Sequence, residues 1–228
     1  MRFKNWILLW TLAFGAFSEA QQKEIKVEAY PQTPSLLEAV KNHDTELVQA
    51  VLKSKTNLEV MDSQKRTPLL IATQNNDVEI ARLLIEAGAD VNAQDQKQDS
   101  PLLYAGAEGR LQILRLIISK GKPNFKIYNR YGGTALIPAC ERGHVDIVKE
   151  LLKTKIDINH KNNLGWTALM ETIVLGDGGP RQQEILQLLV NAKADFNIPD
   201  NDGITPLAHA KRRKFAEMVN ILEKAGAL

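Results

Sequence analysis

A short phrase returns along this chain at a nearly constant interval: threonine or serine, then proline or alanine, then two aliphatic residues. Its copies begin at Thr67, Ser100, Thr134, Thr167 and Thr205. Successive copies lie 33, 34, 33 and 38 residues apart, and a degenerate copy begins at Pro34, 33 residues before the first. Constant spacing means that one supersecondary unit is stacked repeatedly. The sequence therefore predicts an elongated solenoid, and the long groove of a solenoid favours a binding function.

The stretch after Thr67 shows what one unit contains. A short apolar segment, 69–73, is followed by polar residues and then by apolar residues at helical spacing from Val78 to Ile85. Thr67 is a candidate N-cap, and Pro68 suits the first helical position, where its missing N–H would have no partner. Gly88 follows the second helix, where a left-handed residue is expected. Each unit is therefore predicted to be a helix, a turn, a second helix and an extended hairpin.

Several motifs make this unit specific. Gly143-His144 lies between two predicted helices, Ile147-Val148 opens the second apolar run, and 88–92 reads Gly-Ala-Asp-Val-Asn. With the Thr-Pro-Leu opening and the 33-residue period, the chain resembles the ankyrin-repeat family from about Pro34 to its C-terminus. The stretch 163–171 with 176–180 also resembles small exported bacterial members. The resemblance implies an all-α solenoid of about six helix-turn-helix units with short β-hairpin connections. Units one to six are expected at 34–61, 62–94, 95–128, 129–161, 162–199 and 200–228.

The first 20 residues differ in kind from the repeats. Arg2 and Lys4 precede an apolar run from Trp6 to Phe17, and Ser18-Glu19-Ala20 supplies the small residues of a cleavage site. The run is too short to span a membrane, although an uncleaved anchor is the alternative. We expect a signal peptide over 1–20, a polar linker over 21–33 and a periplasmic or secreted protein. A single cysteine and the absence of an Asn-x-Ser/Thr sequon favour a bacterial periplasm.

Charge restricts the partner. Cleavage after Ala20 would leave 27 basic and 26 acidic residues, a balance that gives no long-range attraction to nucleic acid or to an anionic membrane. The basic run 211–214 is expected to be a solvated turn. We therefore expect a monomer that binds a protein or peptide and does not insert into a membrane.

Catalysis by the single cysteine is an alternative. Cys140 and His144 are four residues apart, the minimum for a thiol nucleophile with a base. However, Cys140 occupies the small core position of the first helix, and His144 is the turn histidine of the resembled repeat. The four histidines occupy different repeat positions, so no metal site is expected. The glycine-rich 176–179 lacks the Lys-Ser/Thr of a phosphate loop, and no cofactor is expected. The main prediction is a non-catalytic binding module; a thiol-dependent enzyme and a secreted effector acting on another cell remain alternatives.

The groove of an ankyrin solenoid is formed by hairpin tips and the exposed side of the first helices. In units two and three these positions are polar, whereas in units four and five they include aromatic and aliphatic side chains. Such a patch commonly marks a partner site. The predicted partner-binding residues are Arg130, Tyr131, Arg142, Leu164, Trp166, Val174 and Leu175.

Unit five carries five extra residues between its two predicted helices. They are Asp177, Gly178, Gly179, Pro180 and Arg181. We expect this insertion to border the lower rim of the groove. Alternatively, it folds back over Val174 and Leu175 and covers the apolar patch.

Overall fold

The computed structural model describes residues 35–227, and these residues form one compact body. The predicted signal peptide and the linker fall outside this range, so both stay predictions. Within 35–227 no helix has the length and apolar character needed to cross a membrane.

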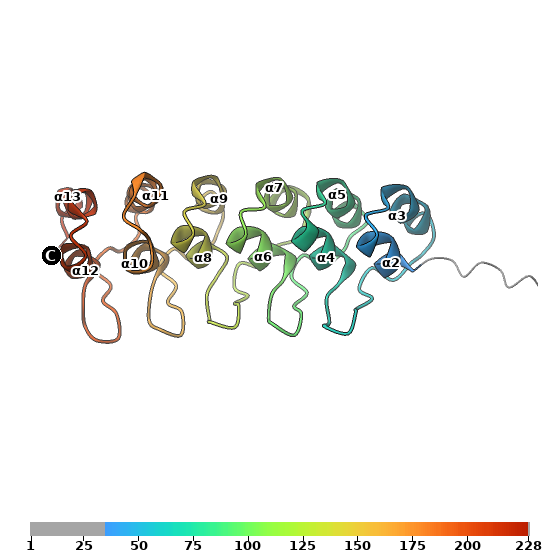
Figure 1. Cartoon of the computed structure of the whole chain (residues 1–228), viewed down its shortest axis with the longest axis horizontal. Coiled ribbons are helices and arrows are strands. Elements are labelled where there is room, and N and C mark those ends of the chain that lie inside the picture. The colour runs from blue at the N-terminus through green and yellow to red at the C-terminus, as the bar shows by residue number, and fades with distance from the viewer. Residues whose placement is uncertain (1–34, 228) are drawn as a thin grey trace, which may run out of the picture. The chain divides into compact units, whose positions relative to one another are not determined.

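The described residues form helix pairs, one pair in each expected unit, in agreement with the all-α solenoid (Figure 1). The pairs are α2 (Leu36–Lys41) with α3 (Thr45–Leu52), α4 (Pro68–Asn75) with α5 (Val78–Glu86), α6 (Pro101–Ala107) with α7 (Leu111–Lys120), α8 (Leu136–Glu141) with α9 (Val145–Leu151), α10 (Ala168–Val174) with α11 (Pro180–Asn191), and α12 (Pro206–Arg212) with α13 (Ala216–Ala225). The first helices form one row, the second helices form a second row, and the hairpins project from the first row. We call the two rows the inner and the outer row.

The repeated phrase begins the inner helices. The Thr67 side chain accepts a hydrogen bond from the Leu70 N–H at 3.2 Å, and Pro68 occupies the first turn, so the predicted N-cap is confirmed. Ser100, Thr167 and Thr205 cap α6, α10 and α12 in the same way. A capping side chain satisfies one of the amide groups that a helix start leaves unpaired.

Unit four departs from this pattern. Helix α8 begins at Leu136 without a side-chain cap, and the buried Thr134 hydroxyl oxygen has no hydrogen-bond partner within 35–227. Pro138 lies four residues after Thr134 and has no N–H to donate to the Thr134 carbonyl. The first turn is therefore left open, and the helix starts later than the phrase predicts.

The hairpins are held by a side chain rather than by a strand ladder. Asn162 Oδ1 accepts hydrogen bonds from the Leu164 and Trp166 amides at 2.9 and 3.0 Å. The same bonds recur at the equivalent residues, Asp62, Asp95, Asn129 and Asp200. These are Asx turns: each is closed by hydrogen bonds from two backbone amides to one side-chain oxygen. The connections expected to be β-hairpins are thus hairpins that contain no strand within the described residues.

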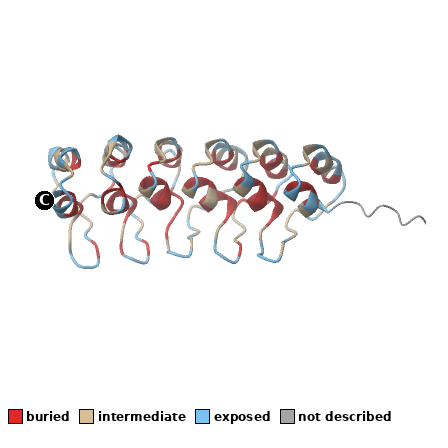
Figure 2. Cartoon of the chain, in the orientation of Figure 1, coloured by how far each residue is buried: buried red, intermediate tan, exposed pale blue. Residues whose placement is uncertain are grey.

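The core is continuous between the two rows (Figure 2). Aliphatic side chains of successive units, such as Leu84, Leu114 and Leu186, are fully buried. Each unit covers its apolar face only by stacking on its neighbours, as expected of a solenoid. Gly88 has φ of +98°, which confirms the left-handed residue predicted after α5.

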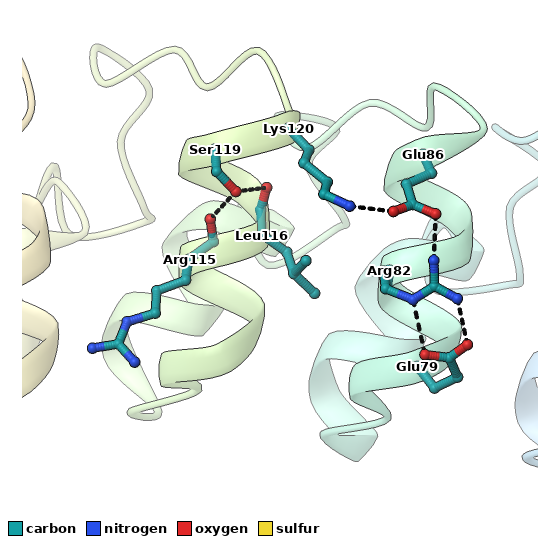
Figure 3. A network of polar contacts seen from close by, with 7 residues as sticks. All are labelled: Glu79, Arg82, Glu86, Arg115, Leu116, Ser119 and Lys120. Carbon is teal, nitrogen blue, oxygen red and sulfur yellow. Dashed lines mark hydrogen bonds and ion pairs between the residues drawn. The ribbon is translucent and has the colours of Figure 1, made fainter.

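Charged side chains of the outer row pair with one another. On α5, Arg82 pairs with both Glu79 and Glu86, and Lys120 of α7 reaches across to Glu86 (Figure 3). Exposed pairs of this kind contribute little to stability, because water and salt screen them. They leave this part of the outer row with its charges mutually compensated.

Candidate functional site

A cavity of about 570 Å³ lies along the inner row, over units three to five. It is lined by α6, α8 and α10 and by the hairpins that precede α8 and α10, and we call it the groove. Its volume is in the range of pockets that hold small ligands or a few residues of a peptide.

Large apolar side chains stand at the groove. Tyr131, Leu164 and Leu175 line it and are 60%, 55% and 49% exposed. The other large hydrophobic residues that are exposed within 35–227, Met61 and Tyr128, are not part of its lining. Apolar surface gathered in a hollow is typical of a binding site.

Two arginines at the groove are already engaged. The Arg130 guanidinium lies 4.6 Å from the ring centre of Tyr131 and 3.9 Å from an oxygen of Asp99. Arg142 pairs with Glu108 and donates to the Ala107 carbonyl at 2.9 Å, which completes the C-terminal end of α6. Arg213 does the same for α10 by donating to the Val174 carbonyl. The charges of Arg130 and Arg142 are therefore shared with acids of the chain itself.

Glu171 lies at the floor of the groove and is 6% exposed. Its Oε1 accepts a hydrogen bond from the Asn162 amide at 2.6 Å, whereas its Oε2 has no partner within 35–227. Burial, helped by the negative charge of Glu141, raises the pKa of Glu171 to about 7, and the Asn162 bond opposes this. Glu141 also lines the groove, and its side chain has no hydrogen bond or ion pair with any described residue.

The structure brings together five of the seven predicted partner-binding residues. Trp166 and Val174 are half-buried and do not line the groove. The residues that do line it are Arg130, Tyr131, Arg142, Leu164 and Leu175. The role of all seven in binding stays a prediction.

The insertion of unit five packs against a residue of unit six. Asp177 accepts a hydrogen bond from the Gly179 amide at 2.7 Å, and Pro180 and Arg181 begin α11. Gly178 lies so close to the ring of Phe215 that an added Cβ would be 2.5 Å from it. None of 177–181 lines the groove. The glycines allow the insertion to pack toward unit six, and its expected place at the rim of the groove stays a prediction.

The thiol alternative finds no support in the geometry. Cys140 is completely buried, and this burial raises the pKa of its thiol. A buried neutral thiol is a poor nucleophile. His144 instead lies 3.2 Å from the Ala107 carbonyl through Nε2. Residues 35–227 contain no group of three or more His, Cys, Asp or Glu side chains able to hold a metal ion.

Glu171 is the residue that sequence reasoning missed. Its equivalents in the other full units, four residues after the repeated threonine or serine, are Ile71, Tyr104, Pro138 and His209. The available signal in the sequence was an acidic residue at a repeat position that the other full units fill with Ile, Tyr, Pro or His.

Comparison with known proteins gives consistent matches. A family model described as "Ankyrin repeats (3 copies)" matches residues 36–127 and 121–200. The chain is 50% identical over 107 residues to YahD of Escherichia coli (strain K12), a match that covers 46% of this chain and 53% of YahD. The chain thus spans about half the length of that relative.

Solved structures match over a larger share. The ankyrin repeat protein EF0377 is 43% identical with a TM-score of 0.82, and the match covers 83% of this chain and 96% of that one. An ankyrin repeat domain from Acinetobacter baumannii AYE is 50% identical with a TM-score of 0.82, covering 85% of this chain and 98% of that one. The helix pairs and their stacking are shared with these bacterial proteins.

Proposed function

Because the chain belongs to the ankyrin-repeat family, we propose that it is a protein-binding module that engages a protein or peptide partner through the groove of units three to five. The observation that carries this proposal is the coincidence of a 570 Å³ cavity with three exposed large hydrophobic residues, Tyr131, Leu164 and Leu175. Removing such side chains from water is the main source of affinity at interfaces.

The proposal includes the absence of catalysis. Cys140 is completely buried and His144 lies within hydrogen-bond distance of the Ala107 carbonyl, so these two residues do not form an accessible thiol nucleophile with a base. Thiol labelling tests this: Cys140 should react only after unfolding, and rapid labelling of the folded protein would favour the thiol-dependent enzyme.

Export is also part of the proposal, and it rests on residues 1–20 alone. Mass spectrometry of the protein recovered from a bacterial periplasm should show a mature N-terminus at Gln21. Recovery of the folded protein with Met1 to Ala20 intact would contradict it. Appearance in the culture medium or in another cell would favour a secreted effector over a periplasmic resident.

The binding site is tested by selecting peptides from a display library of linear 12-residue sequences on the purified protein. We expect Tyr131→Ala and Leu164→Ala each to weaken binding of the selected peptides about tenfold. Met61→Ala is the matched control, because Met61 is 48% exposed but does not line the groove. Trp166→Ala should matter less per folded molecule than Leu164→Ala. Selected peptides that bind Tyr131→Ala and Leu164→Ala as tightly as the wild type would refute the site.

A further inference from the structure

We propose that the groove receives a lysine or arginine side chain of a partner peptide, with its cationic head held by Glu171 and Glu141. This inference rests on the proposed function, and it states which chemistry the partner must present. It is carried by the balance of charge in the groove, by the unused oxygen of Glu171 and by comparison with the other units.

Charge in the groove is not balanced. Four carboxylates line it, those of Asp99, Glu108, Glu141 and Glu171, against the guanidinium groups of Arg130 and Arg142 alone. Arg130 lies beside Asp99, and Arg142 pairs with Glu108. Glu141 and Glu171 therefore line the groove without a cationic partner from the described part of the chain.

Glu171 has the geometry of a receptor for a cation. Its side chain is 6% exposed, so water can compensate its charge only partly. Asn162 donates to Oε1 and fixes the carboxylate, and Oε2 is left with no donor from residues 35–227 while the residue lines the groove. Oε2 is not among the fully buried atoms without a partner, so it is open to water and to a donor from a ligand in the groove.

In units two and six, the buried acid side chain near this position is paired by a base of the chain itself. In unit two, Arg66 donates to Asp62 at 2.9 Å and to the Gln74 side chain at 2.9 Å. In unit six, His209 lies 2.7 Å from Asp200. Unit five has no such base, and a cationic side chain from a partner would supply it.

The apolar part of the groove suits the rest of such a ligand. A lysine or arginine carries three or four methylene groups before its charged head, and these bury favourably against apolar side chains. Leu164 and Leu175 line the groove together with Glu171, and Tyr131 adds an aromatic face. We therefore expect the cationic residue to be flanked by an apolar residue, and acidic peptides to be excluded by repulsion.

Binding should depend on pH, because the cation requires ionised Glu171. Burial holds the pKa of Glu171 near 7, so a cationic ligand gains affinity as pH rises through neutrality. The other charged or titratable groups of the groove are Asp99, Glu108, Arg130, Tyr131, Glu141 and Arg142. The helices packed against α10 carry, besides Glu141, the groups Cys140, Arg181, Glu184, His209, Lys211 and Arg212.

The test uses the full chain as bacterial cells produce it and the peptides selected above. We expect selected sequences to be enriched in lysine or arginine next to an apolar residue. Replacing that cationic residue by norleucine in a synthetic peptide should weaken binding at least tenfold at pH 8. Glu171→Gln and Glu141→Gln should each weaken binding of the cationic peptide several-fold. Neither should change the affinity for the norleucine peptide.

The pH profile separates a direct role from a structural one. Affinity of the wild type for the cationic peptide should rise several-fold from pH 6 to pH 8, and Glu171→Gln should flatten that rise. Glu46→Gln, an exposed carboxylate on α3, is the control that should leave affinity and profile unchanged.

The outcomes distinguish this inference from the proposed function. Peptides that lose affinity with Leu164→Ala but not with Glu171→Gln, Glu141→Gln or norleucine would overturn the cation site and keep the groove. If no selected peptide depends on Tyr131 or Leu164, the groove is not the binding site and both proposals fall.

Discussion

Units five and six use the same two positions for a buried polar contact, with opposite results. In unit five the hairpin residue Asn162 donates to Glu171 on α10 at 2.6 Å; in unit six the hairpin residue Asp200 lies 2.7 Å from His209 on α12. Arg212 donates to His209 Nδ1, which leaves the ring proton on Nε2 for Asp200. In unit six a base of the chain, His209, thus binds the acid Asp200. In unit five the acid Glu171 lines the groove without such a base.

This difference shows how a repeat can be specialised without a change of backbone. Asn162 and Asp200 form the same Asx turn and differ only in whether the second side-chain atom donates or accepts. In unit six the acid is the hairpin residue Asp200. In unit five it is Glu171 on the inner helix α10, which lines the groove. Four changes test this comparison.

Removing the hairpin side chain of unit five should have the largest effect. Asn162→Ala deletes the bonds to the Leu164 and Trp166 amides and to Glu171, so we expect the free energy of unfolding to fall by about 3 kcal/mol at pH 7. Urea denaturation measures it. The control is Asp202→Ala, an exposed residue of the next hairpin, with an expected change under about 0.5 kcal/mol. A loss below about 1 kcal/mol for Asn162→Ala would contradict the role of the Asx turn.

Neutralising the uncompensated acid should stabilise the protein above neutral pH. The folded pKa of Glu171, about 7, is raised above its ordinary value of 4.5, so the cost of burying the charge appears as pH rises from 4.5 through 7. Glu171→Gln should raise the free energy of unfolding by about 2 kcal/mol at pH 8 and change it little at pH 5. Equal effects at both pH values would show that the change acts through packing rather than charge.

Grafting the unit-six pair into unit five should recover part of its stability. Asn162→Asp alone places a second carboxylate beside Glu171, and adding Glu171→His turns the pair into one like Asp200 with His209. A double-mutant cycle should give a favourable coupling of about 1 kcal/mol. The value is modest because Val174 stands where unit six has Arg212. Zero coupling would mean that the two units differ in more than these residues.

The smallest effect concerns Asp200. The hydrogen bond from His209 lowers the pKa of Asp200 below its ordinary value of 3.8. The contribution of ionised Asp200 to the free energy of unfolding is therefore present above pH 3.8 and is lost as pH falls through the lowered pKa. Asp200→Asn should lower the Tm by about 2 °C at pH 7, and the difference should shrink at pH 3. A constant difference would assign the effect to the turn and not to the hydrogen bond with His209.

Local signals of the sequence predicted the fold well, because each unit is built from short-range rules. The cap at Thr67 and the left-handed Gly88 follow from neighbours within a few residues, and the near-constant period repeats the same rules in each unit. The late start of α8 did not follow from the phrase at Thr134, because it depends on Pro138, which lies outside the phrase.

The groove was predicted less completely, because its floor depends on contacts between units. Trp166 was expected at an exposed tip, but the structure half-buries it, and its exposure could not be read from repeat position alone. The insertion 177–181 was located correctly in sequence, yet its neighbour Phe215 belongs to another unit. Glu171 lies at a position that is usually closed to solvent, so its access to the groove appeared only when three units were assembled.

The arginines that complete inner-helix ends impose a direction on synthesis. The Ala107 carbonyl at the end of α6 accepts a hydrogen bond from Arg142, 35 residues later in the chain. The Val174 carbonyl at the end of α10 accepts one from Arg213, 39 residues later. In a nascent chain the end of α6 or α10 therefore stays unfinished until the first half of the following unit has been translated. A premature stop codon before Arg213 would remove more than unit six, because it would also reopen the end of α10.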